Sequence, residues 1–151
     1  MANEIRTKLD AWTNFTITLA SLATASARQS TIIANTTLRP AALIDFKIQS
    51  GTVAPTNGTV FEFFLLRGDN SGNRDDNAGA SDAAITIENA PLLGTLVVTA
   101  TASKNFQRIF DTAALGKLGT EFGVAVRNST GQTMNATQQA PRYALYLPEI
   151  Q

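Results

Sequence analysis

The chain of 151 residues contains no cysteine and no histidine. Without cysteine it cannot form a disulfide, use a thiolate nucleophile or bind zinc through sulfur. Without histidine it lacks the commonest general base and the usual transition-metal ligand, so serine–histidine and cysteine–histidine catalysis are excluded. The sequence therefore predicts a protein that is not an enzyme, and it points to no catalytic, cofactor-binding or metal-binding residues.

Charged residues are scarce as well. They make up 16% of the chain, against about 25% in an average soluble protein. Twelve basic residues balance twelve acidic ones, so nothing directs the chain to nucleic acid or to an anionic membrane, and we expect neither partner. Neutral polar residues fill the deficit. A surface of this kind loses little hydration when it is covered, which suits a domain packed against neighbours; a merely threonine-rich β-protein is equally compatible.

Long apolar runs are missing too. The longest stretches, such as residues 63–66 and 92–98, are far shorter than the roughly 20 residues that span a bilayer. The first eleven residues are polar and charged, without the apolar centre of a signal peptide. We therefore expect synthesis in the cytoplasm, an N-terminal arm over residues 1–11 and a single domain over residues 12–151.

Alternation of apolar and polar residues, the period of a half-buried strand, recurs along the whole domain. It predicts strands at residues 12–19, 28–38, 42–49, 59–66, 84–88, 91–102, 105–111, 121–127 and 142–147. Gly94 is expected to mark a bulge or bend, and Pro148 to end the last strand. Residues 67–82, rich in Gly, Asn, Ser and Asp, predict the longest loop.

Eight or nine strands separated by turn residues are typical of a sandwich or barrel, and no convincing helix interrupts them. The predicted fold class is therefore all-β, an antiparallel β-sandwich. Within that class a jelly-roll-like arrangement is the first choice.

The long loop contains oxygen-bearing side chains with the spacing of calcium ligands: Asp69, Ser71, Asn73, Asp75 and Asp76. In an EF-hand the sixth position is glycine and the twelfth is a bidentate glutamate. This chain has Arg74 and Ala80 there. A solvated, turn-rich loop is the favoured interpretation, and a weak calcium site is the alternative.

Two kinds of short motif also occur. Arg67, Gly68 and Asp69 form the tripeptide that integrins recognise at loop tips, although a simple strand-to-turn transition accounts for it equally well. The N-glycosylation pattern begins at Asn14, Asn35, Asn57, Asn128 and Asn135. Because Asn and Thr are so frequent here, we interpret these matches as coincidental.

Four aromatic residues could line a sugar-binding face: Trp12, Phe15, Tyr143 and Tyr146. Packing in the core is the favoured use of these side chains.

Several segments resemble small virion proteins that tailed bacteriophages encode near their head genes. They are residues 42–48, followed by Gly51 and residues 54–56, then residues 60–66 leading into a polar loop, and finally residues 122–131 with a last strand at Tyr143. They are spread over residues 42–147, a span of about two thirds of the chain.

The resemblance implies a capsid decoration, or cement, protein with a jelly-roll-like fold. Such a protein binds the major capsid protein on the exterior of the virion, stabilises the shell by bridging capsomers, and forms a homotrimer at local three-fold positions. The arm (residues 1–11) and the long loop (residues 67–82) are then expected to reach neighbouring subunits. The alternative is a phage tail or fibre module that binds host glycans, and a host-derived carbohydrate-binding or adhesion module is the third choice.

Overall fold

The computed structural model describes residues 5–69 and 71–150, and these contain eleven strands, two short 3-10 turns and no α-helix. One sheet consists of β1 (Ile5–Leu9), β2 (Thr13–Asn14), β5 (Ala41–Gln49), β9 (Asn105–Asp111) and β11 (Arg142–Ile150). The other consists of β3 (Ala27–Gln29), β4 (Ile33–Ala34), β6 (Val60–Gly68), β7 (Ala83–Ala84), β8 (Leu92–Val97) and β10 (Glu121–Ser129). The 3-10 turns are η1 (Asp75–Asn77) and η2 (Thr112–Leu115). The predicted all-β sandwich is confirmed, and within the described residues no helix is long and apolar enough to cross a membrane.

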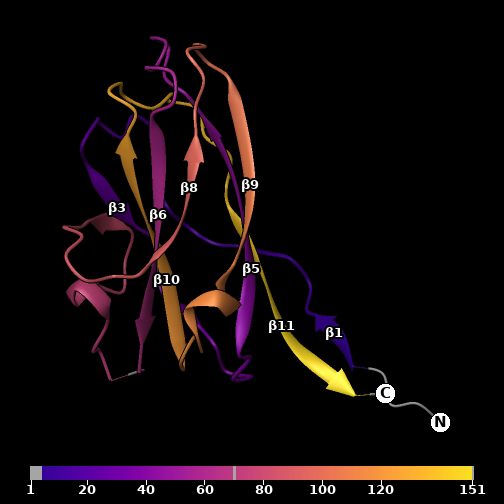
Figure 1. Cartoon of the computed structure of the whole chain (residues 1–151). Helices are drawn as coiled ribbons and strands as arrows, with labels where there is room; N and C mark the ends of the chain where they lie inside the picture. Colours follow the sequence, from indigo (N-terminus) through magenta and orange to yellow (C-terminus); the bar gives the residue numbers. More distant parts are fainter. Residues whose placement is uncertain (1–4, 70, 151) are drawn as a thin grey trace.

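All the strand pairings are antiparallel. The first sheet has the order β1–β11–β5–β9 and the second β7–β3–β10–β6–β8, with β2 on β11 and β4 on β10. Figure 1 shows the two layers side by side and the pair β1–β11 running out beyond them. The pairings are nested along the chain: β6–β8 lies inside β5–β9, which lies inside β3–β10, which lies inside β1–β11.

Apolar side chains from the facing sides of the two sheets form the core. In β6 the alternate residues Phe61, Phe63 and Leu65 are almost completely buried, as the two-residue period of a strand requires. The ring centroid of Phe63 lies 4.8 Å from that of Phe46 in β5 and 4.5 Å from that of Phe110 in β9. These spacings are favourable for tilted aromatic pairs, so the three rings tie the two sheets together.

The outer face of the second sheet is covered by the chain itself. A second, smaller apolar cluster forms there from Phe64, Leu66, Ala78, Ala90 and Ala125, with Ile85 and Ile87 packed against it. Its members come from β6, from β10 and from the segment 78–90. The end of the long loop and the short strand β7 therefore fold back onto their own sandwich.

Four predicted strands are confirmed, with small shifts at their ends: residues 42–49, 59–66, 105–111 and 121–127. The expected irregularity at Gly94 is confirmed as well. Phe63 lies opposite Gly94, whereas Phe64 lies opposite Leu92, so the register of the β6–β8 pair shifts between these positions. This is a β-bulge.

The strand predicted at residues 12–19 is wrong beyond its first residues, although the alternation of burial that suggests it is real. Phe15, Ile17 and Leu19 are buried and the residues between them are exposed. Only Thr13–Asn14 pairs as a strand. The N–H of Phe15 donates to the C=O of Pro141 beside the first sheet, and the C=O of Thr16 accepts from the N–H of Thr31 beside the second. The segment thus crosses between the sheets. Its alternation of apolar and polar residues reflects which side chains are buried, although the backbone beyond Asn14 is not paired with a neighbouring strand.

Three further predicted strands are shorter than expected. The strand predicted at residues 91–102 is confined to β8 (Leu92–Val97). The other two differ more from expectation. The stretch at residues 28–38 is divided into β3 and β4 because the hydroxyl of Ser30, in place of a backbone carbonyl, accepts the N–H of Val124 at 3.0 Å. The strand predicted at residues 84–88 is reduced to the two residues of β7. Local propensity favours both segments as strands, but side-chain bonds and loop packing take over the pairing.

Pro148 does not end the last strand. It lies within β11, opposite Thr7 of β1. The C=O of Leu145 accepts the N–H of Asp10 at 2.8 Å, so position 145 points its backbone groups toward the arm. By alternation Pro148 points toward the other side, where β5 has already ended at Ala41. Its missing N–H therefore removes no ladder bond, and the strand continues.

Candidate interaction surface

Beyond the sandwich, β1 is the one neighbour that β11 has among the described residues. β5 pairs with β11 no farther than Tyr146, whereas β1 pairs with it from Tyr146 to Ile150. Residues 5–8 and 147–150 therefore form a two-stranded ribbon, which projects at the lower right of Figure 1. Four residues at about 3.3 Å each give a projection of about 13 Å. We refer to this pair of segments as the ribbon.

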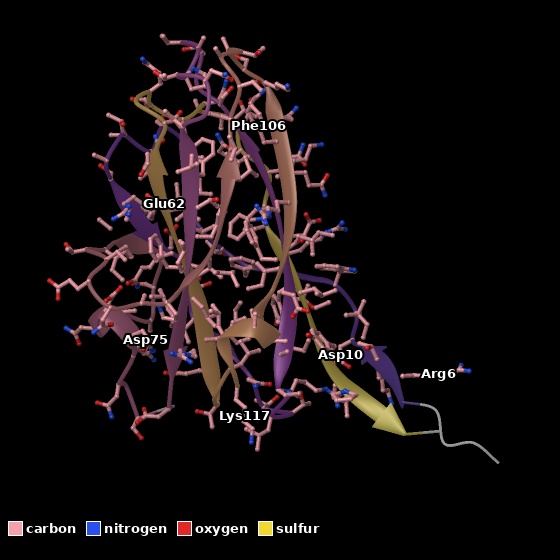
Figure 2. The ribbon with its side chains drawn as sticks, in the orientation of Figure 1. Arg6, Asp10, Glu62, Asp75, Phe106 and Lys117 are labelled. Atoms are coloured by element: carbon pink, nitrogen blue, oxygen red, sulfur yellow. The ribbon has the colours of Figure 1, made fainter. Side chains whose placement is uncertain are left out.

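The ribbon includes part of the predicted N-terminal arm. Residues 5–9 are paired as β1 in the isolated chain, which differs from an arm that becomes ordered only on a neighbour; residues 1–4 lie outside the described part of the chain. Figure 2 shows Arg6 directed away from the ribbon and Asp10 at its base. A two-stranded hairpin on its own is only marginally stable in water. Contact with another protein would therefore stabilise this element most.

The two long edges of the ribbon are not equivalent. On the β11 side, Pro148 withholds a hydrogen-bond donor from the edge that β5 leaves open, which protects that edge against strand addition. On the other side, within residues 5–69 and 71–150, β1 pairs with β11 alone, and it contains no proline. An added strand would thus find donors and acceptors along β1.

Ion pairs and a stacked ring hold the base of the ribbon in place. The guanidinium of Arg39 donates to both carboxylate oxygens of Asp10, each at 3.0 Å. Trp12 lies under the guanidinium of Arg142, 4.9 Å from ring centroid to Cζ. Arg142 also pairs with the carboxylate of Asp45 at 2.8 Å, and that carboxylate is 5% exposed. These contacts attach the segment that follows β1, residues 10–12, to the sandwich.

An apolar hollow lies beside the ribbon's base, where β5 ends and leaves one side of β11 uncovered. Its volume is ≈ 310 Å³, and it is lined by Pro40, Ala41, Ala113, Gly116, Lys117, Tyr146 and Pro148. Lys117, at the end of the sandwich in Figure 2, is the one charged residue of this lining. The phenol of Tyr146 donates to Asp111 at 2.6 Å, and burial, followed by this carboxylate, raises the pKa of Tyr146 to about 12. We refer to this apolar recess as the basal hollow.

Of the five residues with calcium-ligand spacing, Asp69, Asn73 and Asp75 line one hollow, together with the guanidinium-bearing Arg67 and Arg74. Asp69 accepts from the N–H of Ser71 and from the amide of Asn73, at 2.9 and 3.0 Å, and these bonds hold the pKa of its carboxyl below the ordinary value. Asp75 pairs with Arg67. Asp76, in contrast, accepts backbone N–H groups from residues 88–90. Among the residues that the structure describes, no three acidic side chains gather as a metal site.

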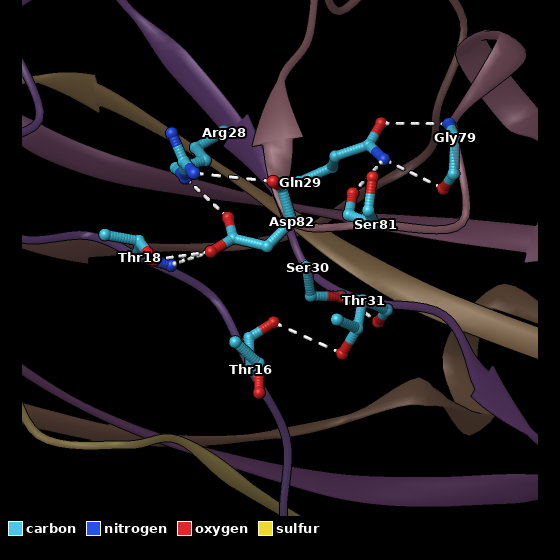
Figure 3. Close-up of polar contacts among 9 residues, drawn as sticks. All are labelled: Thr16, Thr18, Arg28, Gln29, Ser30, Thr31, Gly79, Ser81 and Asp82. Atoms are coloured by element: carbon cyan, nitrogen blue, oxygen red, sulfur yellow. Dashed lines mark hydrogen bonds and ion pairs between the residues drawn. The ribbon is translucent and has the colours of Figure 1, made fainter.

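Asp82, which the sequence reasoning did not single out, is the centre of a network that fixes the end of the long loop (Figure 3). Its carboxylate accepts from the N–H and hydroxyl of Thr18, at 2.9 and 2.5 Å, and from Nε of Arg28 at 2.5 Å. Burial raises the pKa of the Asp82 carboxyl, but the hydrogen bonds from Arg28 and Thr18 outweigh burial and lower it overall. Beside it, the amide of Gln29 donates to the carbonyls of Gly79 and Ser81, at 2.8 and 2.7 Å.

The start of the loop is fixed by two ion pairs. Arg67 pairs with Asp75 at 3.3 Å and donates to the carbonyl of Leu115 at 3.1 Å. Its guanidinium is therefore engaged, and the Arg-Gly-Asp tripeptide is not displayed at a loop tip. Arg74 lies against Glu121 of β10, with Nε 2.7 Å from Oε1. The start of the long loop is thus held against its own sandwich; whether the loop also reaches a neighbouring subunit stays a prediction.

Of the four aromatic candidates for sugar binding, Phe15 and Tyr143 lie together, with ring centroids 6.2 Å apart, but on the core side of the first sheet. Phe15 is buried in the core, and Tyr143 packs edge-on against Phe122. Trp12 stacks on Arg142 and Tyr146 bonds to Asp111, so the four rings do not share one exposed face. Core packing and structural contacts are the use that the structure shows for them.

Two of the glycosylation matches lie inside the protein. Asn35 is 1% exposed and Asn128 is fully buried. The Asn128 amide donates to the carbonyls of Leu22 and Gln132, at 2.9 and 2.7 Å. These two side chains are structural, which agrees with the interpretation of the matches as coincidental.

Sequence reasoning did not identify the ribbon or the basal hollow. The one signal for them is Pro148, which interrupts an otherwise regular alternation from residue 142 onward and marks the place where one neighbour of a strand is missing. In comparisons with known proteins, no family model and no curated sequence matches this chain.

Proposed function

We propose that this chain is a phage capsid decoration protein, which binds the major capsid protein on the outside of the shell and stabilises it by bridging capsomers as a homotrimer. The ribbon is the observation that supports the proposal most directly. It is a strand pair that runs beyond the sandwich, and the Arg39–Asp10 ion pair lies at its base. Such an element gains stability when a neighbouring protein covers it.

The strand order supports a jelly roll as the finer description of the sandwich. Counting β1, β3, β5, β6, β8, β9, β10 and β11 as eight successive strands, one sheet has the order 1–8–3–6 and the other 2–7–4–5. Strand 4 pairs with 5, 3 with 6, 2 with 7 and 1 with 8, which is one long hairpin rolled around the core. Rolling of this kind produces the double-sheet jelly roll of viral structural proteins.

Bridging by such a protein is an effect of repetition. One ribbon offers only a few residues of contact, so a single attachment is weak. A trimer on a repeating lattice engages several sites at once, and the second and third contacts form at high effective concentration. The low charge of the chain, 16% of its residues, keeps the desolvation cost of wide contact surfaces small.

Electron cryo-microscopy of purified virions tests the proposal. Density for this chain at three-fold or quasi-three-fold seams of the head is expected, with the ribbon touching the capsid surface. Density confined to the tail tip would overturn it and favour the alternative of a host-binding module.

A binding assay with undecorated capsids provides a matched comparison between two truncations. Removal of residues 1–9 deletes β1 and is expected to reduce co-sedimentation with capsids at least tenfold, because β11 then projects without its partner. Removal of residues 1–4 spares β1 and is expected to bind like the full chain. Equal binding by both truncations would exclude the ribbon as the attachment element.

A further inference from the structure

Leu38 is the most exposed large apolar side chain in the described part of the chain, with 66% of its surface accessible. Its backbone is also unusual, because φ is +50°. Left-handed conformations are disfavoured for bulky residues, and glycine or asparagine normally occupies such positions. An exposed leucine held in this conformation combines two costs in one residue, which points to a role outside the folding of the monomer.

The turn that carries Leu38 is rigid. The buried amide of Asn35 donates to the carbonyls of Arg39 and Gly119, each at 2.8 Å, and its oxygen accepts the N–H of Arg39 at 2.9 Å. The N–H of Leu38 donates to the carbonyl of Asn35 at 3.0 Å. Arg39 in turn pairs with Asp10 at the base of the ribbon. The leucine is thus presented on a fixed support with little freedom to fold back onto its own surface.

The basal hollow begins two residues later. Pro40 belongs to its lining, and the carbonyl of Pro40 accepts the N–H of Leu118, which anchors this wall to the end of the sandwich. The hollow is lined mainly by apolar atoms of Pro40, Ala113, Tyr146 and Pro148. It is open to solvent.

We propose that the basal hollow receives Leu38 of a second copy of this chain. Both halves of the contact, an apolar projection and an apolar recess, belong to the same molecule and lie at the same end of it. Each copy therefore offers both, so the contact can run head-to-tail from one copy to the next and close as a ring of three copies. The zero net charge of the chain leaves no long-range repulsion between copies.

This contact names the self-association surface that the homotrimer in the proposed function requires, but it needs no capsid. Self-association in solution and attachment to capsids are therefore measured separately. A chain that self-associates through Leu38 and does not bind capsids would contradict the proposed function alone.

Cysteine cross-linking tests the contact directly, because the natural chain contains no cysteine. Leu38→Cys protein is mixed with Ala113→Cys protein and oxidised, so that a mixed disulfide forms only between two copies. The expected product is a mixed dimer in at least tenfold excess over that from the control pair Val53→Cys and Ala113→Cys. Val53 is a suitable control, because it is 60% exposed and follows the opposite end of β5. Equal yields from both pairs would overturn the proposal.

The variant Leu38→Gly separates association from folding. Glycine accepts the left-handed backbone without strain, so the unfolding midpoint is expected to stay the same or to rise. Sedimentation velocity at tens of micromolar protein is expected to show the natural chain associated and the variant at least tenfold weaker, while Val53→Gly associates normally. A monomeric natural chain, or undiminished association of Leu38→Gly, would overturn the proposal.

Discussion

The ion pair between Arg74 and Glu121 makes a quantitative prediction about the long loop. Its side chains are 14% and 7% exposed, which makes it the most buried ion pair within the described part of the chain. Nη2 of Arg74 donates to Oε2 of Glu121 at 3.2 Å. The closer Nε–Oε1 contact, at 2.7 Å, has the distance of a hydrogen bond but not the geometry, and both of these atoms are buried without another partner. The hydrogen-bonding capacity of the two side chains is therefore incompletely used, and each buried charge depends on the other for its stabilisation.

Removal of one partner should cost far more than removal of both. Loss of one member of a buried pair costs about 3–5 kcal/mol, because the remaining charge stays buried and unpaired. Since this pair keeps some solvent contact through Arg74, we expect about 2–4 kcal/mol for Arg74→Met and for Glu121→Gln. The double variant Arg74→Met/Glu121→Leu should recover most of that loss, because apolar replacements of buried pairs are often neutral.

Equilibrium urea unfolding measures these changes. With a slope of about 1–3 kcal/mol per molar urea, a loss of about 3 kcal/mol moves the midpoint by about 1–3 M. The control is Arg67→Met, which removes the more exposed pair with Asp75 and should cost about 1 kcal/mol or less. The reasoning is refuted if the double variant loses the sum of the two single losses, because the charges would then not be coupled.

Three further predictions concern the core, acid stability and the bulge. Phe63→Ala should lower the free energy of unfolding by about 3–5 kcal/mol in urea titrations, because it leaves a cavity between the two sheets. The hydrogen bond from Arg127 holds the pKa of the Glu62 carboxyl below its ordinary value. The stability that this pair contributes is therefore present above the pKa of Glu62 in the unfolded chain, and it is lost as pH falls through the pKa of Glu62 in the folded chain. Below about pH 5, the thermal unfolding midpoint of Glu62→Gln should therefore fall less than that of the natural chain. In Gly94→Ala the new methyl would lie 2.8 Å from the Phe110 ring, which should cost about 1–3 kcal/mol in the same titrations. The packing described would be contradicted if Phe63→Ala or Gly94→Ala left the free energy of unfolding unchanged. It would also be contradicted if the thermal midpoints of Glu62→Gln and of the natural chain fell in parallel as pH is lowered.

The strands that the sequence predicts well are those whose burial and pairing coincide. β5 alternates buried Ile44, Phe46 and Ile48 with more polar residues, and it has a neighbour on each side. In such a strand the alternation in the sequence indicates both which face is buried and that the backbone is hydrogen-bonded to neighbouring strands. The bulge at Gly94 is predictable for a similar reason, because a glycine inside an apolar strand often marks a bulge or a close approach of another group.

Features that depend on distant partners are not predictable in this way. Asp82 has the sequence context of one more polar loop residue, yet its bonds reach Thr18 and Arg28, 64 and 54 positions away. Likewise, the alternation around Phe15 gives no sign that the segment crosses between sheets. Pro148 predicts a strand end because proline lacks the N–H that a strand donates to its neighbour. Only the topology reveals that no neighbouring strand lies on that side of Pro148 to accept a hydrogen bond.

The nested pairing explains why an interaction surface lies where it does. The inner pairs, β6–β8 and β5–β9, close over the aromatic core, whereas the outermost pair, β1–β11, brings the first and last strands together at the rim. The ribbon is the outer part of that last pair, and it runs beyond the sandwich. Elements with few buried contacts open at low cost, so a neighbour can bind, reshape or replace pairing in the ribbon without disturbing the core. The part of the rolled hairpin that can change its pairing is therefore the outermost strand pair. Leu38 and the basal hollow lie beside this pair, because Arg39 next to Leu38 forms an ion pair with Asp10 and Pro40 lines the hollow.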